Sequence, residues 1–363
     1  MMADADPETR VLMLKAAIVH AWDDLEDEDA RSAALDRLED LQRLDEKNGG
    51  LSAPEVKQLV AAATSAMAFG AVEERAVTFA IAEPRAAEVR GDLVELLANR
   101  SEPAARELLS KLLASGGATD VANAFSDPRP GLRGAAARAA QSLVEQSHRL
   151  DPAEAKAQEA RLKPGLEVLT ADDDALVAIR AVVTLERMGR ADGVERLEAI
   201  YRRGDEGTRI RVAEALGEMP PEEAWPFFSL ILAEPTRTGG GLLRAAALRG
   251  MGLSGHPKAV GLLVCYLLND ENRSVRVAAA DALAEMEGDE ARFALIRALT
   301  EGQPDAERRA RLVDVLGRIP GDTVTEVLLA YLEDKDRTVA DIAALRLAEH
   351  NVAATVPYLI SIV

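Results

Sequence analysis

One helical pattern recurs along the second half of the chain. Between Val275 and Met286, apolar residues stand at i, i+3, i+4, i+7, i+8 and i+11, which places them on one side of a helix and the charged residues on the other. At intervals of 31 to 35 residues, the place of Leu283 is taken by Leu185, Leu216, Met251, Leu316 and Leu347. One such unit cannot bury its own apolar side, so the repetition predicts stacked units with a continuous core.

A second, shorter pattern with apolar residues at i, i+3, i+4 and i+7 precedes most copies of the first. One unit carries it as Val260, Leu263, Val264 and Leu267. Two such patterns joined by a short turn predict a pair of antiparallel helices in each unit. Aromatic residues make up only 3% of the chain, and alanine and leucine dominate it, which favours helices over strands. We therefore predict an all-α fold.

The repeat is regular in only part of the chain. Residues 1–50 predict an acidic helical hairpin, residues 51–150 predict degenerate helical repeats continuous with the regular ones, and residues 151–363 carry the regular repeat. Within the degenerate part, helices are expected around residues 85–98, 102–114 and 131–149. A dense acidic run from Asp23 to Asp29 suits a solvated loop and helix N-terminus, and its alternative role is a docking patch for a basic surface.

The turn and the second helix share residues that point to a family. The second helix of one unit reads Val-Arg-Val-Ala-Ala-Ala-Asp-Ala-Leu. An aspartate often stands six residues before the place of Arg276, as Asp127, Asp172, Asp270 and Asp334. This pattern resembles the short HEAT-like repeat, the type also found in phycobilin lyase subunits, over about residues 155–363. The resemblance implies an α-α superhelix, that is, a HEAT-like repeat solenoid.

The resemblance also implies a structural role for one column of arginines. In HEAT-like families, the aspartate of the turn and an arginine of the second helix form a hydrogen-bonded ladder. Four successive units of this chain place an arginine there, namely Arg209, Arg244, Arg276 and Arg309. For these arginines we expect a structural role rather than ligand binding.

In the same families the second helices line the concave side of the solenoid. Six and ten residues after the place of Val275, side chains are expected to point away from the apolar stripe. The charged residues at these positions are Glu214, Glu218, Arg249, Asp281, Glu285, Asp314 and Arg318. Acids predominate in two of the four units, so we hypothesise that this face binds a basic segment of a partner protein, although a solvated face would carry the same residues.

The chain ends on a first-helix pattern that has no second helix after it. Terminal repeats usually carry a polar outer face, but this end finishes on Ser-Ile-Val. Leu359, Ile360 and Val363 therefore form a candidate interface, and a two-fold homodimer is its simplest arrangement. The alternatives are a chain cut within a longer protein and a helix shifted to hide its own stripe.

Composition argues against several classes of function. The formal net charge of −19 works against phosphate binding, so we expect no nucleic-acid partner. Cys265 is the only cysteine, which excludes an internal disulfide and a thiolate metal cluster. The four histidines stand far apart without His-Glu pairs, and we expect no metal and no cofactor. Apolar runs are too short for a signal peptide or a membrane span, so we expect a cytoplasmic protein with no membrane partner.

The stretch from Gly250 to Gly255 formally matches the GxGxxG motif of dinucleotide-binding folds. It follows a predicted helix rather than a strand, so we interpret its glycines as the end of that helix and a turn. The sequence thus favours a non-catalytic scaffold for protein–protein interaction over an enzyme. Two alternatives stay open: a lyase-type or chaperone-like subunit that acts with a partner subunit on a protein-attached group, and a nucleic-acid enzyme, which the net charge disfavours.

Overall fold

The computed structural model describes residues 86–100, 103–234, 240–286, 288–301 and 304–350. These residues form helices and no strands, as the sequence predicts, and they fall into two compact units with the boundary between Met188 and Gly189. The predicted hairpin at 1–50 and the terminal candidates Leu359, Ile360 and Val363 lie outside the described residues.

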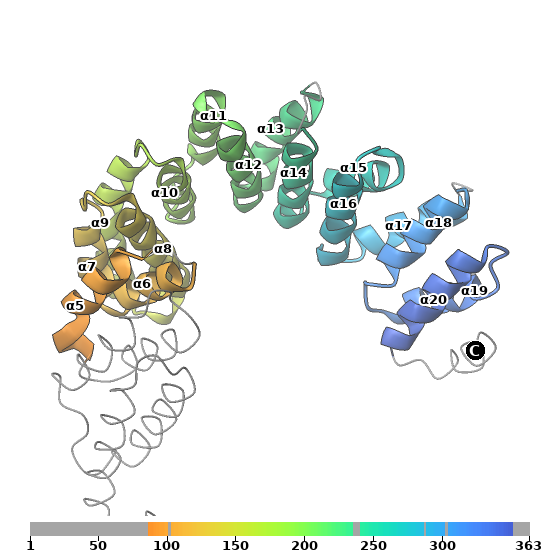
Figure 1. Cartoon of the computed structure of the whole chain (residues 1–363), viewed down its shortest axis with the longest axis horizontal. Coiled ribbons are helices and arrows are strands. Elements are labelled where there is room, and N and C mark those ends of the chain that lie inside the picture. The colour runs from red at the N-terminus through yellow and green to blue at the C-terminus, as the bar shows by residue number, and fades with distance from the viewer. Residues whose placement is uncertain (1–85, 101–102, 235–239, 287, 302–303, 351–363) are drawn as a thin grey trace, which may run out of the picture. The chain divides into compact units, whose positions relative to one another are not determined.

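The helices of the first unit are α5 (Ala86–Ala98), α6 (Pro103–Ser115), α7 (Gly117–Ala124), α8 (Pro130–Gln146), η1 (Ser147–Arg149), α9 (Pro152–Leu169) and α10 (Ala175–Arg187). Sequence-adjacent helices pack as the pairs α5–α6, α7–α8 and α9–α10. The second helices α6, α8 and α10 contact one another in order, and α7 contacts α9 on the opposite layer (Figure 1). Contacts between α8 and α9 continue the packing across residue 150.

The helix α7 is not among the expected helices, because Ser115, Gly116 and Gly117 indicate a break. The chain does turn there, with a positive φ of 77° at Gly117, but it resumes a helix at once. Val121 is fully buried in α7 and Ala124 is 9% exposed, so this short helix has its own place in the core of the unit.

The second unit contains α11 (Gly193–Arg203), α12 (Glu206–Ala215), η2 (Leu216–Glu218), α13 (Pro221–Ala233), α14 (Gly240–Ser254), α15 (Pro257–Asn269), α16 (Arg273–Glu285), α17 (Glu290–Thr300), α18 (Ala306–Leu316), α19 (Asp322–Tyr331) and α20 (Arg337–Glu349). Each odd-numbered helix packs on the even-numbered helix that comes after it. The even-numbered helices α12, α14, α16, α18 and α20 contact one another in order, and we call them the second-helix layer (Figure 1).

The apolar stripe of α16 forms part of the core, as its spacing predicts. All of the stripe residues before Met286 are at most 3% exposed, namely Val275, Ala278, Ala279, Ala282 and Leu283. The first-helix pattern is buried as well, since Leu263 in α15 is fully buried and Leu267 is 2% exposed. Small alanine side chains allow the second helices to lie close together, while leucines fill the space between the two layers.

The structure contradicts the interpretation that Gly250 and Gly252 of the GxGxxG stretch end the helix. α14 continues through Gly250 and Gly252, and only Gly255, with φ of 66°, marks its end. A Cβ atom on Gly250 would lie 2.4 Å from the carbonyl oxygen of Ala213 in α12, and one on Gly252 would lie 2.6 Å from the Cβ atom of Ala282 in α16. The first two glycines therefore make room for the neighbouring helix on either side.

Candidate partner-binding face

The arginines at the place of Arg276 join one helix pair to the next within each compact unit. In the first unit, Arg133 Nε and Nη2 donate to the two carboxylate oxygens of Asp172 at 2.6 and 2.9 Å. In the second, Arg309 binds Asp334 in the same side-on manner, at 2.8 and 2.9 Å. Each aspartate lies in the turn of the following helix pair, so each contact forms one rung between neighbouring pairs.

Two further rungs are longer. Arg244 Nε lies 3.4 Å from a carboxylate oxygen of Asp270, and Arg209 Nη1 lies 4.0 Å from Glu234. The Arg209 guanidinium also stands 5.1 Å from the centre of the Tyr201 ring, whose hydroxyl donates to Glu234 at 2.9 Å. The pKa of Tyr201 is raised by burial and then by this carboxylate.

Arg276 differs from the other ladder arginines. Its Nη1 donates to the carbonyl oxygens of Asp270 and Glu271, in the turn before its own helix, at 2.9 and 3.0 Å. Arg133 and Arg309 use Nη1 on the carbonyls of their own turns in the same way. No described carboxylate pairs with Arg276, so its rung is open within the described part of the chain.

The ladder aspartates also organise their own turns. Asp172 accepts a hydrogen bond from the backbone N–H of Asp174 at 2.9 Å, and Asp174 then caps α10 by accepting from the N–H of Leu176. Aspartates in turns commonly cap the following helix in this way. The hydrogen bond from Arg133 lowers the pKa of Asp172 although burial opposes it, so the carboxylate is held in its charged form.

The structure places the predicted partner-binding residues along the second-helix layer and joins four of them in pairs. Arg249 on α14 lies 3.2 Å from Glu214 on α12. Arg318, just after α18, donates to Asp281 on α16 at 2.8 Å. These ion pairs form a second series of contacts between neighbouring helix pairs, and their side chains are 29% to 48% exposed.

The remaining candidates are arranged differently. Asp314 on α18 accepts from Nη2 and Nε of Arg346 on α20, at 2.7 and 3.1 Å. Sequence reasoning missed Arg346 because it stands seven residues after the place of Val275, rather than six or ten. Glu218 in η2 and Glu285 at the end of α16 are exposed.

Exposed apolar side chains interrupt the charges of the second-helix layer. Leu253 on α14 is 68% exposed and stands at one of the outward-pointing positions. Leu345 on α20 is 55% exposed and stands at the other. Single exposed leucines are common on protein surfaces, but these two share a face with the paired charges and give it apolar contact points.

A buried histidine lies at the start of α15. His256 is 2% exposed, and its Nδ1 accepts a hydrogen bond from the backbone N–H of Lys258 at 3.1 Å, which caps the helix. Its ring stacks on Trp225, with centroids 4.6 Å apart, and its Nε2 lies 3.3 Å from Glu222. The stacked contact explains why Trp225 is half-buried.

We expect His256→Ala to lower the free energy of unfolding by about 1.5 kcal/mol, because it removes both the cap and the aromatic contact. His256→Asn keeps a capping side chain and should lose roughly half as much. Urea unfolding at pH 7 compares the two variants, with the exposed His148→Ala as a control. Equal losses for alanine and asparagine at residue 256 would contradict a capping role.

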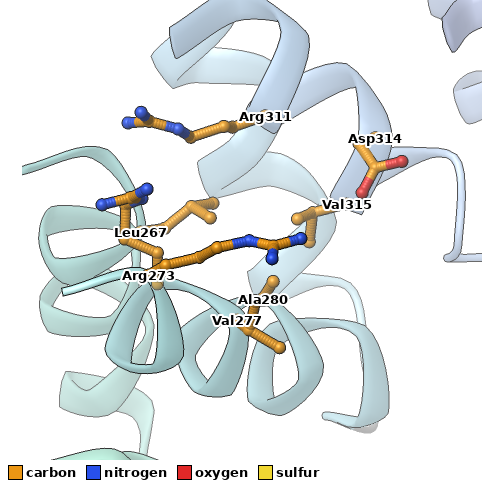
Figure 2. Close-up of a pocket in the computed structure, with 8 residues that line it drawn as sticks. Leu267, Arg273, Val277, Ala280, Arg311, Asp314 and Val315 are labelled. Carbon is orange, nitrogen blue, oxygen red and sulfur yellow. The ribbon is translucent and has the colours of Figure 1, made fainter. Parts of the chain in front are cut away.

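An open cavity of about 250 Å³ lies between α15, α16 and α18 of the second unit. Three arginines line it, Arg273 and Arg276 from α16 and Arg311 from α18. Figure 2 labels Arg273 and Arg311. The other lining residues are Asp314 and the apolar Leu267, Val277, Ala280 and Val315. Sequence reasoning missed this cluster because Arg311 stands on another helix than Arg273 and Arg276, and the three share no repeat position.

Two kinds of feature are absent from the described residues. No three or more histidine, cysteine, aspartate or glutamate side chains among them are arranged to hold a metal ion. None of the helices in the described ranges is both long and apolar enough to cross a membrane.

The sequence matches a known repeat family. The family described as HEAT repeats matches residues 162–238 and 241–309, which include helices of both units. No curated protein matches the chain. The matched residues contain the stripe of α16 that defines the repeat in the sequence.

Several solved structures are similar in fold. Importin beta is 14% identical with a TM-score of 0.51, over 91% of this chain and 50% of the importin chain. The complex of CpcE and CpcF of phycocyanin lyase from Nostoc sp. PCC7120 is 17% identical with a TM-score of 0.34, over 67% and 92% of the two chains. An engineered protein is 20% identical with a TM-score of 0.38, over 96% of each. The chain thus spans about half the length of importin beta.

The stacked helix pairs and the ladder of arginines and aspartates between them are consistent with the HEAT-repeat family that matches the sequence. The likeness to importin beta adds that the fold is an α-solenoid. The chain therefore contains HEAT repeats at residues 162–238 and 241–309, and its fold is an α-solenoid.

Proposed function

We propose that the protein is a non-catalytic scaffold that binds a partner protein through the second-helix layer of residues 189–363. The observation that carries this proposal is the row of outward-pointing charges on α12, α14, α16 and α18, with the exposed Leu253 and Leu345 on the same layer. Repeat proteins commonly use such extended surfaces for binding. Apolar anchors surrounded by charged groups are typical of protein interfaces.

The exposed ion pairs of this layer can be broken so that their acidic groups bind a partner. The Arg249–Glu214 pair is 48% and 35% exposed, and exposed pairs of this kind contribute about 0 to 1 kcal/mol. A basic group of a partner can therefore replace the arginine at small cost. The net charge of −19 also attracts a basic partner over distances within the screening length. For these reasons we propose a basic segment as the bound element.

The proposal includes no reaction catalysed by the chain itself. Titratable groups with shifted pKa values often mark active sites, but structural ion pairs shift them too. In this protein, the lowered pKa values of Asp127, Asp172 and Asp334 result first from hydrogen bonds with arginines. All three aspartates lie in turns between helices, where they organise the backbone.

Charge reversal on α16 tests the proposed face. Partners are captured with the full chain from the native source, and the association rate of a purified partner is then measured at low and high salt. We expect Asp281→Lys with Glu285→Lys to slow association about tenfold at low salt, and much less at high salt, because the effect is electrostatic.

The control carries the same change of net charge on the other layer. Glu326 and Glu333 are exposed on and just after α19, so Glu326→Lys with Glu333→Lys should change the rate by less than about twofold. Circular dichroism checks that both double variants keep their helices. The proposed face is wrong if the α16 variant associates at the wild-type rate at low salt, or if the control is slowed equally.

A further inference from the structure

The open rung at Arg276 has a cause in the sequence. The position six residues before the ladder place holds an aspartate in several turns, including Asp172, Asp270 and Asp334. Six residues before Arg309, this position is occupied by Gln303, an uncharged residue. The neighbouring rungs on Arg244 and Arg309 have carboxylates of the chain, but the repeat supplies none at this position for Arg276.

Arg276 nevertheless has the same anchoring as its counterparts. In Arg133 and Arg309, Nη1 binds the carbonyls of the preceding turn, and Nε and Nη2 then bind a carboxylate side-on. In Arg276, Nη1 binds the carbonyls of Asp270 and Glu271 in the same way. The guanidinium is therefore held in place for a carboxylate that the described chain does not provide.

The arginine-lined cavity opens at this position. Arg273 and Arg311, on facing helices, add two further guanidinium groups to its lining (Figure 2). Arg273 is exposed and makes no hydrogen bond or ion pair with any described residue. Arg311 donates to the carbonyl oxygen of Leu268 at 3.2 Å and pairs with the exposed Glu307. The carboxylate of Asp314 in the lining is bound by Arg346.

We propose that this arginine cavity binds an acidic side chain of a peptide segment of a partner protein. A carboxylate of that segment completes the rung on Arg276, bound side-on as Asp334 is bound by Arg309. Arg273 and Arg311 contribute additional positive charge beside it. The site adjoins the proposed basic-segment surface, since Asp314 belongs to both, and it requires the opposite charge on the bound group.

Size and chemistry favour a side chain rather than a larger ligand. Pockets for drug-sized molecules usually measure about 300 to 1,000 Å³, and this open cavity of about 250 Å³ holds one or two side chains. Its lining includes Val277, which is 47% exposed, so an apolar residue next to the acidic one has a surface to contact. The chain itself shows which group an arginine in this position binds, because the other rungs end on carboxylates.

Fluorescence anisotropy with a labelled peptide tests the site in the full chain. The probe is Gly-Glu-Asp-Leu-Glu-Asp-Gly, and its partner probe replaces Glu and Asp by Gln and Asn. We expect the acidic probe to bind and the neutral probe to bind at least tenfold more weakly. Arg276→Gln should weaken the acidic probe about tenfold, because hydrogen bonds to a charged group are lost, and Arg273→Gln about threefold.

The matched control is Arg337→Gln, since Arg337 stands in α20 at the repeat position that Arg273 has in α16, and it should leave binding unchanged. Arg276→Gln removes contacts to its own turn, so thermal unfolding accompanies it. Arg273→Gln removes no hydrogen bond or ion pair within the described chain and tests the site without that complication. The proposal is overturned if the wild type does not bind the acidic probe at millimolar concentration, if both arginine variants bind like the wild type, or if inorganic phosphate displaces the probe at equal concentration.

Discussion

Replacing Gly250 with alanine is expected to lower the free energy of unfolding of the second unit by about 3 kcal/mol. In an ordinary helix the same change would stabilise the protein by about 0.5 to 1 kcal/mol, because glycine is a poor helix former. At Gly250 the new Cβ atom would lie 2.4 Å from the carbonyl oxygen of Ala213 and 2.9 Å from Cε1 of Phe228. A backbone atom cannot move aside alone, so α12 and α14 must separate.

The control for this prediction is Gly261→Ala in α15. Gly261 is also inside a helix, but a Cβ atom there meets nothing within 4 Å, so this variant should be slightly more stable than the wild type. Urea and thermal unfolding of the full chain measure both changes, and hydrogen exchange locates the loss to α12 and α14. A Gly250→Ala protein as stable as Gly261→Ala would show that the two helices do not approach as described.

Periodicity in the sequence is sufficient to predict the helix pairs, and the reason is that the core repeats with them. The stripe of α16 is buried, and so is the first-helix pattern of α13, where Phe228 is 1% exposed. The pattern is weakest in α11, where the spacing of i, i+3, i+4 and i+7 falls on Val194, Leu197, Glu198 and Tyr201. The structure buries Leu197 and Tyr201 of this set, and it buries Ile200 in addition.

Contacts between neighbouring helix pairs are harder to predict, because the spacing of the partners in the sequence depends on the lengths of the helices between them. The Arg133–Asp172 rung joins residues 39 apart, whereas the Arg309–Asp334 rung joins residues 25 apart. An arginine column is visible in the sequence, but the acid that each arginine reaches belongs to the next turn. For the same reason the sequence does not predict the ion pair between Asp281 and Arg318. Because of such pairs, the second-helix layer has fewer unpaired acids than its composition suggests.

The glycines of α14 show a different limit of sequence reasoning. Gly250 and Gly252 look like a helix end, since glycine is common there. Their role in close helix packing can be recognised only from the positions of the neighbouring helices, because each glycine faces a different helix. The arginine cavity is similar, since Arg273 and Arg311 come together only through the packing of α16 on α18.

Removing the carboxylate from one rung is the second large effect that we expect. Asp334→Asn keeps a side-chain oxygen for the N–H of Asp336, which Asp334 binds at 2.8 Å, but it leaves Arg309 without its counter-charge. Breaking a fully buried pair costs about 3 to 5 kcal/mol. The two side chains here are 13% and 9% exposed, so partial solvation reduces the expected loss to about 2 kcal/mol.

A pair on the surface of the same region supplies the comparison. Arg337 and Asp341 lie 3.7 Å apart on α20 with side chains 74% and 45% exposed. Asp341→Asn should therefore change the free energy of unfolding by less than about 0.5 kcal/mol. If both asparagine variants lose the same free energy of unfolding, the Arg309–Asp334 rung contributes no more to stability than an exposed ion pair.

The effect of Asp334→Asn should also depend on pH. The hydrogen bond from Arg309 lowers the pKa of Asp334 in the folded state, against the opposing effect of burial. A free aspartate titrates near pH ~3.9, so the unfolded chain binds this proton first as the pH falls. The contribution of the rung is complete above about pH 5 and is lost as the pH falls through the folded pKa. In urea unfolding at pH 7, 5, 4 and 3, the difference between wild type and Asp334→Asn should therefore shrink below pH 4, whereas a constant difference would mean that the charge of Asp334 does not stabilise the fold.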